Sequence, residues 1–293
     1  MPWRRPSSWP LPAALILVLA GFSANSLLCR AALGSDLADA ASFSFLRLGG
    51  GALALLLLLH RGRSTLTGAL HPGRALALAA YALTFSFAYR ALTAGTGALL
   101  LFGAVQATLF GLALASGEQL TPRKGTGAAL AFAGLLVLTL PSAHRPQAWA
   151  ALLMLVAGAA WGAYTWLGRG SSRALVDTAA AFLGATALAL GPLLLAGNRH
   201  LTPTGALLAL ASGTLASGAT YALWYTVVPR LGAIRAAVAQ LAVPPLTAAA
   251  GAAWLGEVPG APWFLAAALT LGGIGLALTG ASPEARREEA VPE

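Results

Sequence analysis

Ten apolar stretches of about 20 residues, separated by short segments rich in Pro, Gly and Arg, run through the chain. An α-helix of that length crosses a bilayer core, where every backbone polar group has to be satisfied internally. The alternating pattern of barrel strands is absent. The sequence therefore predicts an all-α integral membrane protein with ten transmembrane helices. We expect these spans at residues 11–30, 38–59, 74–92, 95–115, 124–141, 148–168, 174–196, 204–226, 232–255 and 262–281.

The composition agrees with a membrane protein, because 58% of the residues are hydrophobic and only 9% are charged. Soluble domains contain about 25% charged residues. The arginines are scattered between the apolar runs, which is typical of loop anchoring and unlike the clustered basic face of a nucleic-acid-binding protein. The lone Cys29 excludes an intramolecular disulfide and a cysteine-based metal cluster. The predicted partners are the lipid bilayer and a small-molecule substrate, with no nucleic acid.

The placement of basic residues predicts the orientation. With both termini in the cytoplasm, 13 of the 18 Lys and Arg lie on the inner side, four lie on the outer side, and Arg47 lies within the second span. Cytoplasmic loops of membrane proteins carry the excess of basic residues. We therefore expect a multi-pass protein of the inner membrane with both termini cytoplasmic.

A repeat divides the chain into two halves. Residues 13–21 reappear at 150–158 with five of nine positions identical, and Glu118 and Gly134 recur 139 residues later as Glu257 and Gly273. The first copy follows Arg4 and Arg5 like a signal peptide, but its second copy lies in mid-chain, which favours a retained helix.

The internal repeat predicts two domains, at residues 1–142 and 147–281, followed by a cytoplasmic tail at 282–293. Five spans in each half invert the second half relative to the first. Inverted repeats are an architecture of secondary transporters, which hold their substrate near the midplane.

Polar and aromatic residues recur within the spans, and polar groups inside a membrane usually face a cavity because lipid cannot solvate them. Ser and Thr can instead bond their own helix backbone, and aromatic residues near span ends can form interfacial belts. The side-chain amides of Gln106 and Gln240 are harder to explain in that way, because each amide needs several hydrogen-bond partners. The candidate substrate-binding residues are Asn25, Tyr81, Phe85, Phe102, Gln106, Trp161, Tyr164, Thr165, Ser217, Tyr221 and Gln240.

Adjacent prolines, Pro244 and Pro245, interrupt the ninth span. They remove two backbone donors, so the helix is expected to kink or break there. The pair is a candidate hinge, and a purely structural kink is an equal alternative. The equivalent positions of the first half are Val105 and Gln106, so the two halves differ here.

No acidic residue falls at the middle of a span, so the carboxylate relay of many proton-driven pumps is missing. The histidines lie in loops, and no metal constellation, P-loop or nucleophile elbow is present. The sequence therefore predicts neither an enzyme nor an ATP-driven pump, and no cofactor.

Several motifs resemble the drug/metabolite transporter superfamily, in particular its EamA-type members. Both halves close on a similar Gly-Glu segment, at Ser116–Thr121 and at Trp254–Glu257, each leading into spaced glycines. Residues 43–47 (Phe-Ser-Phe-Leu-Arg) resemble the family's span-two arginine motif, and residues 160–164 resemble its aromatic span-six motif. The resemblance implies metabolite export by alternating access around a cavity lined by both halves.

Within that family, exporters of amino acids, including aromatic ones, are the most similar. Together with the residues above, this predicts a monomeric exporter of small amphipathic metabolites without obligatory proton coupling. Export of cationic drugs or other organic cations is an alternative, because aromatic rings also bind cations. A membrane scaffold or receptor that transports nothing is an alternative of another class.

Overall fold

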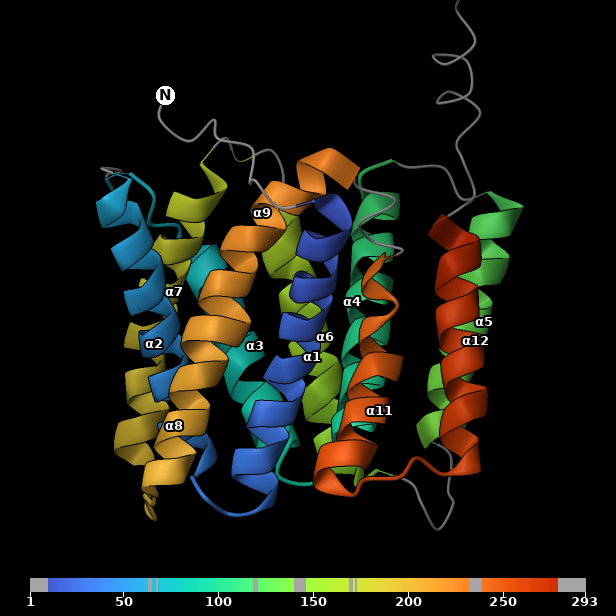
Figure 1. Cartoon of the computed structure of the whole chain (residues 1–293). Helices are drawn as coiled ribbons and strands as arrows, with labels where there is room; N and C mark the ends of the chain where they lie inside the picture. Colours follow the sequence, from blue (N-terminus) through green and yellow to red (C-terminus); the bar gives the residue numbers. More distant parts are fainter. Residues whose placement is uncertain are drawn as a thin grey trace, which may run out of the picture.

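The computed structural model describes residues 10–62, 65–66, 68–117, 121–139, 146–168, 171, 173–231 and 239–278. With α8, η1 and α9 counted as one continuous helix, these residues form ten helices, side by side and alternating in direction (Figure 1). The elements are α1 (Leu11–Gly34), α2 (Ala40–Arg61), α3 (Pro72–Ala88), α4 (Ala94–Ala115), α5 (Pro122–Thr139), α6 (Ala148–Gly168), α7 (Ala174–Leu195), α8 (Pro203–Ala211), the π-helix η1 (Ser212–Ala219), α9 (Thr220–Leu231), α11 (Val243–Leu255) and α12 (Ala261–Leu278).

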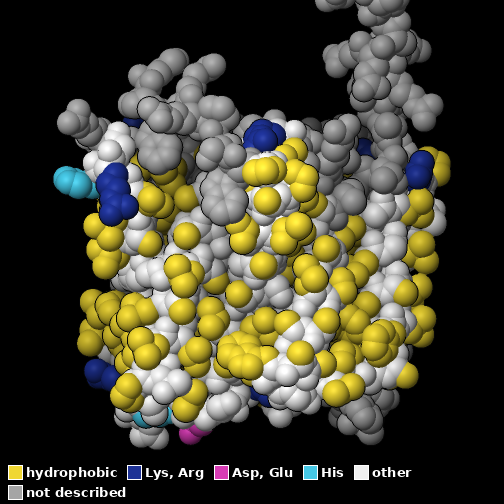
Figure 2. All heavy atoms as spheres, in the orientation of Figure 1, with side chains coloured by type: hydrophobic (Ala, Val, Ile, Leu, Met, Phe, Trp, Pro, Cys, Tyr) yellow, Lys and Arg dark blue, Asp and Glu magenta, His cyan; other side chains and the backbone are white. Residues whose placement is uncertain are grey.

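The surface of the bundle is that of a membrane protein. Hydrophobic side chains cover its middle height, whereas Lys and Arg lie near the upper and lower rims (Figure 2). By length and composition, six described helices can cross a membrane, namely α1, α2, α4, α6, α7 and the segment 203–224, while α11 and α12 are shorter and apolar. For the described residues, the expectation of an all-α, multi-pass membrane protein is therefore confirmed.

Helix starts follow local capping chemistry. Asp39 caps α2, its Oδ1 accepting hydrogen bonds from the backbone N–H of Ala41 (3.0 Å) and Ser42 (2.9 Å). Burial opposes ionisation of this carboxyl, but hydrogen bonds from Ser42, His200 and Ala41 outweigh it and hold the pKa of Asp39 below its usual range. The same carboxylate accepts from the N–H of His200 (3.1 Å), which ties the start of α2 to the segment before α8.

Helices α5 and α12 pack against each other in antiparallel directions at one edge of the bundle (Figure 1). Small residues permit the close approach, with Gly127 facing Gly273 and Gly134 facing Thr270. The Thr270 hydroxyl donates to the carbonyl oxygen of Ala131 at 3.4 Å, between residues 139 positions apart.

One large hydrophobic core joins the helices, and α12 contributes Trp263, Ala266 and Ala267 to it. Helix α3 packs on α6 and α7, α2 packs on α7, α8 and η1, and α1 packs on α8, η1, α9 and α11. Contacts therefore join residues from the two ends of the chain throughout the bundle.

The expected interruption of the ninth span is present. Residues 239–240 are helical, 241–242 form a turn, and α11 begins at Val243 with Pro244 and Pro245 in its first turn. Proline is compatible with that position because the first-turn N–H groups have no helical acceptor. Glu118, the first nine residues and the tail 282–293 lie outside the described residues, so the expectations about them stay predictions.

Candidate functional site

A buried polar network joins α1, α2, α3 and η1 near the middle of the bundle. The Asn25 amide Nδ2 donates to Tyr81 Oη (3.1 Å), and Arg47 Nη2 donates to the same oxygen (2.8 Å). The Ser212 hydroxyl donates to Asn25 Oδ1 (2.7 Å). All four residues are buried. The network thus links three helices of the first half of the chain to the π-helix of the second.

Aromatic rings surround this network and continue it across the bundle. Trp161 of α6 lies between Tyr81 of α3, with ring centroids 4.9 Å apart, and Tyr221 of α9, 5.2 Å away. The rings in contact with these three are Phe22, Phe85, Tyr164 and Phe182. We call the polar network and these rings the central cluster. Tilted and edge-on ring pairs at such distances are favourable, and their flat faces can accept another apolar or aromatic group.

Arg47 is the charged member of the central cluster, and it was absent from the candidate residues. Its guanidinium carbon lies 4.7 Å from the centre of the Phe85 ring and 5.1 Å from that of Tyr81. The side chain is only 2% exposed. A lone charge within an apolar span was the sequence signal that could have identified it.

The π-helix η1 carries two buried serines, Ser212 and Ser217. Thr220 Oγ1 donates to the carbonyl of Leu215 (2.8 Å), five residues earlier. Gly213 lies directly against the backbone carbonyl of Arg47, so α2 and η1 touch through backbone. Ser212 then reaches Asn25, and the Ser217 hydroxyl is buried without a partner. A π-segment leaves no clear period in the sequence, but such segments are frequent at functional sites.

Of the predicted residues, those that the structure brings into the central cluster are Asn25, Tyr81, Phe85, Trp161, Tyr164 and Tyr221, with Ser217 buried on the neighbouring η1. Tyr164 Oη also donates to Thr178 (3.2 Å).

The other candidates lie elsewhere. Phe102 is buried in α4, Gln106 is half-buried there, and Gln240 is half-buried before α11. Thr165 is exposed and donates to the carbonyl of Trp161 (2.8 Å), which is the backbone bonding left open as its alternative.

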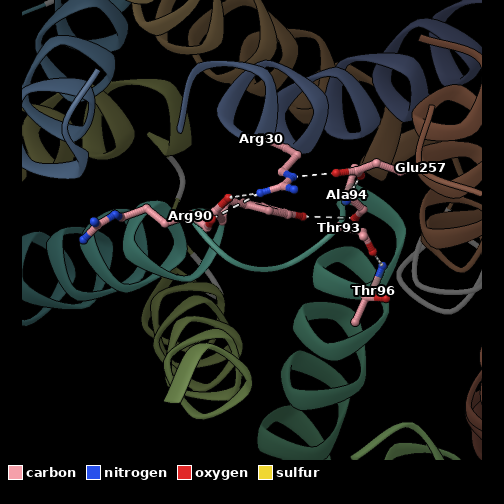
Figure 3. A network of polar contacts seen from close by, with 7 residues as sticks. Arg30, Arg90, Thr93, Ala94, Thr96 and Glu257 are labelled. Carbon is pink, nitrogen blue, oxygen red and sulfur yellow. Dashed lines mark hydrogen bonds and ion pairs between the residues drawn. The ribbon is translucent and has the colours of Figure 1, made fainter. Parts of the chain in front are cut away.

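An ion pair lies at the lower end of the bundle in Figure 1. Arg30 Nε of α1 lies 2.5 Å from Glu257 Oε1, in the loop after α11, and Glu257 Oε2 accepts from the N–H of Ala94 (2.7 Å) at the start of α4. Figure 3 shows Arg30 reaching to the Arg90 carbonyl as well (3.3 Å). The pair therefore ties together α1, the α3–α4 loop, α4 and the end of α11.

A second ion pair lies at the opposite end. Arg74 Nη1 of α3 lies 2.6 Å from Asp177 Oδ2 of α7, and Arg74 Nε donates to the carbonyl of Leu167 (3.1 Å) at the end of α6. At each end of the bundle, one arginine thus contacts three or more segments through an ion pair and hydrogen bonds. The central cluster lies between these two ion pairs.

Apolar helices around a buried polar and aromatic centre define the class as a polytopic membrane protein with polar groups inside the bundle. The model of the EamA-like transporter family matches residues 148–279. The chain is 50% identical over 279 residues to the uncharacterized protein PA1977 of Pseudomonas aeruginosa, covering 94% of this chain and 96% of that protein. A protein of known crystal structure shares the fold, with a TM-score of 0.62, 19% identity and coverage of 90% of this chain and 97% of that one.

The chain belongs to the EamA-like transporter family. This confirms the resemblance that the Gly-Glu closes and the span-two and span-six motifs suggested.

Proposed function

We propose that this protein is a secondary transporter that exports small amphipathic metabolites, amino acids with aromatic side chains among them, across the inner membrane. The central cluster carries the proposal. Trp161 lies between Tyr81 and Tyr221, and Asn25 bonds both Tyr81 and Ser212, so both halves of the chain contribute to one centre. Ring faces beside a few fixed polar groups suit a molecule with apolar bulk and a polar head.

Alternating access of two inverted halves is the proposed mechanism. Its support is the crossing of α5 and α12, where Thr270 bonds Ala131 across an offset of 139 residues, the spacing of the sequence repeat. Two halves related by a two-fold axis would touch through equivalent residues at that axis. The antiparallel directions of α5 and α12 fit an axis in the membrane plane, which is the arrangement of inverted repeats.

Orientation and coupling follow from charge. Among the described residues, six Lys and Arg flank helix ends at the top of Figure 1 and three at the bottom, so we place the top in the cytoplasm.

The described carboxylates lie at helix ends and none is central, so no obligatory proton coupling is proposed. The helices of a single chain complete the central cluster, so we propose a monomer.

Organic-cation export, the main alternative, is disfavoured by the fixed positive charge of Arg47 at the centre. A cation entering the central cluster would meet a like charge in a medium of low dielectric constant, which costs free energy.

Counterflow into proteoliposomes tests the proposal, with labelled phenylalanine or threonine outside and unlabelled amino acid inside, with and without a pH gradient. We expect saturable uptake that does not require the gradient. Strict dependence on an imposed proton gradient would contradict the uncoupled mechanism. Absence of any amino-acid uptake would contradict the substrate class and favour a scaffold or receptor.

Variants connect the transport to the central cluster. Trp161→Ala and Tyr221→Ala each remove a ring that makes at least three ring contacts in the central cluster. Each should slow transport about tenfold or more, since one ring pair contributes about 1 kcal/mol beyond area burial and about 1.4 kcal/mol is a factor of ten. Trp254→Ala is the matched control, because that indole is 55% exposed on α11. Equal loss of transport in the control would show that the cluster has no special role.

A further inference from the structure

Arg47 is a buried charge whose hydrogen bonding is incomplete. Its side chain is 2% exposed, and Nη2 donates to Tyr81 Oη at 2.8 Å. The other terminal nitrogen, Nη1, is buried and has no hydrogen-bond partner. An arginine side chain stays protonated in proteins, so a full positive charge with an unused donor lies in the middle of the bundle.

No carboxylate in the described part of the chain balances this charge. The acidic residues there are Asp36, Asp39, Asp177 and Glu257, all at helix ends. Asp36 is 92% exposed, Asp177 pairs with Arg74, and Glu257 pairs with Arg30. Asp39 caps α2 and accepts from His200. The rings of Phe85 and Tyr81 are the cationic group's other neighbours, and they replace only part of its lost hydration.

The surroundings of the guanidinium fit an anion attached to an apolar group. Tyr81 touches both the Arg47 side chain and the Trp161 ring, so the charged site adjoins the aromatic part of the central cluster. The Ser217 hydroxyl, also buried and without a partner, lies on η1, which packs on α2. A carboxylate accepts hydrogen bonds at both oxygens, which matches the paired N–H groups of a guanidinium.

We propose that Arg47 binds the carboxylate of the transported substrate and that the rings around Trp161 hold its apolar part. The substrate class is therefore carboxylates with apolar or aromatic bulk, of which amino acids are one subset, and a substrate amine is not required. This inference rests on the proposed transport function, because the sealed Nη1 is reached only when the two halves separate.

Substrate analogues test the inference in the unaltered protein. Counterflow of labelled phenylalanine is measured against unlabelled 3-phenylpropionate, which keeps the carboxylate, and against phenylalaninamide and phenethylamine, which lack it. We expect 3-phenylpropionate to compete within about threefold of phenylalanine, and the two amines to be weaker by about 30-fold or more, since leaving a buried charge unpaired is costly. Equal competition by the amines would overturn the inference.

The matching variants are Arg47→Gln, which removes the charge, and Arg47→Lys, which keeps it. We expect Arg47→Gln to lose the preference for carboxylates and Arg47→Lys to retain part of it. Arg199→Gln is the control for removal of an arginine, since Arg199 bonds only backbone carbonyls at the lower rim. If Arg47→Gln fails to fold, the analogue series in the unaltered protein still tests whether the site requires a carboxylate.

Direct binding to the detergent-solubilised protein separates the two proposals. Displacement of labelled 3-phenylpropionate by phenylalanine, without transport of either compound, would support the carboxylate site and contradict the transport function. Transport of phenylalanine with no discrimination against phenethylamine would support the transport function and overturn the carboxylate site.

Discussion

At the residue scale, the position of Arg47 depends on a glycine of another helix. A Cβ on Gly213 would collide with the backbone carbonyl oxygen of Arg47, and backbone cannot move aside as a flexible side chain can. The contact keeps η1 and α2 close enough for Ser212 and Arg47 to share the network around Asn25 and Tyr81.

We therefore expect Gly213→Ala to destabilise the protein by about 1–3 kcal/mol and to abolish most transport, because overpacking separates α2 from η1. Thermal unfolding in detergent and counterflow measure the two effects. Gly111→Ala is the control, since a Cβ there meets nothing within 4 Å and alanine favours a helix. A Gly213→Ala protein as stable and active as the control would contradict the tight backbone contact.

At the element scale, the caps and end contacts fix where helices start and how their ends are joined. Asp39 is such a point, because its carboxylate caps α2 and also holds the segment before α8. Asp39→Ala should lower stability by about 1 kcal/mol, whereas Asp39→Asn keeps an acceptor oxygen and should lose less.

The Asp39 effect should depend on pH. Its pKa is lower in the folded than in the unfolded state, so the folded state binds fewer protons. The stabilisation is complete above about pH 4, the ordinary range of the carboxyl, and declines as pH falls through the lowered value. Unfolding midpoints of the parent and Asp39→Ala should therefore converge in acid, and a gap that widens in acid would contradict the assignment.

The Arg30–Glu257 pair makes a further prediction for the elements that it joins. Glu257→Gln removes the charge that holds α1 to α4 and to the end of α11, a loss of about 1–3 kcal/mol for a charged hydrogen bond. We expect that end of the bundle to open more often. Cys29, the only cysteine and fully buried beside Arg30, then becomes reactive toward a membrane-impermeant maleimide added outside.

Asp177→Asn breaks the ion pair at the opposite end and provides the control for this labelling. It should leave Cys29 protected from the outside reagent. Equal labelling of Cys29 in both variants would mean that the Arg30–Glu257 pair does not govern access from that end.

At the scale of the whole molecule, the two halves differ in charge. Residue 184, which is 137 positions after Arg47, is a glycine that packs on Ala75. One half therefore supplies the central charge, and under the proposed carboxylate site one anion per protein would balance it. An empty protein that changes conformation has to carry the unpaired guanidinium through its buried state, whereas a substrate carboxylate neutralises it.

Exchange should consequently be faster than net movement. We expect counterflow of phenylalanine to exceed its net efflux from proteoliposomes by about tenfold or more, since about 1.4 kcal/mol of unbalanced charge suffices for that ratio. In Arg47→Gln the two rates should approach each other. Equal rates in the unaltered protein would contradict a barrier set by the empty, charged site.

Much of this protein was predictable from its sequence, because lipid imposes strong constraints. A bilayer excludes unpaired backbone groups, so apolar runs identified the helices, and the paired prolines identified the break before α11. Tyr81 and Phe85 are four residues apart in the sequence, which puts them on one face of α3, where both are buried. The Gly-Glu closes and the span-two and span-six motifs gave the family.

Tertiary structure alone decided which polar residues meet. Ser212, the first residue of the π-helix η1, joins the network through Asn25, although no 3.6-residue pattern marked it. The Thr165 hydroxyl bonds a backbone carbonyl of its own helix, whereas Glu257 pairs with Arg30, 227 residues away in the sequence. Sequence determined the helices because each one satisfies its own backbone, whereas the partners of Arg47 and Trp161 depend on how those helices pack.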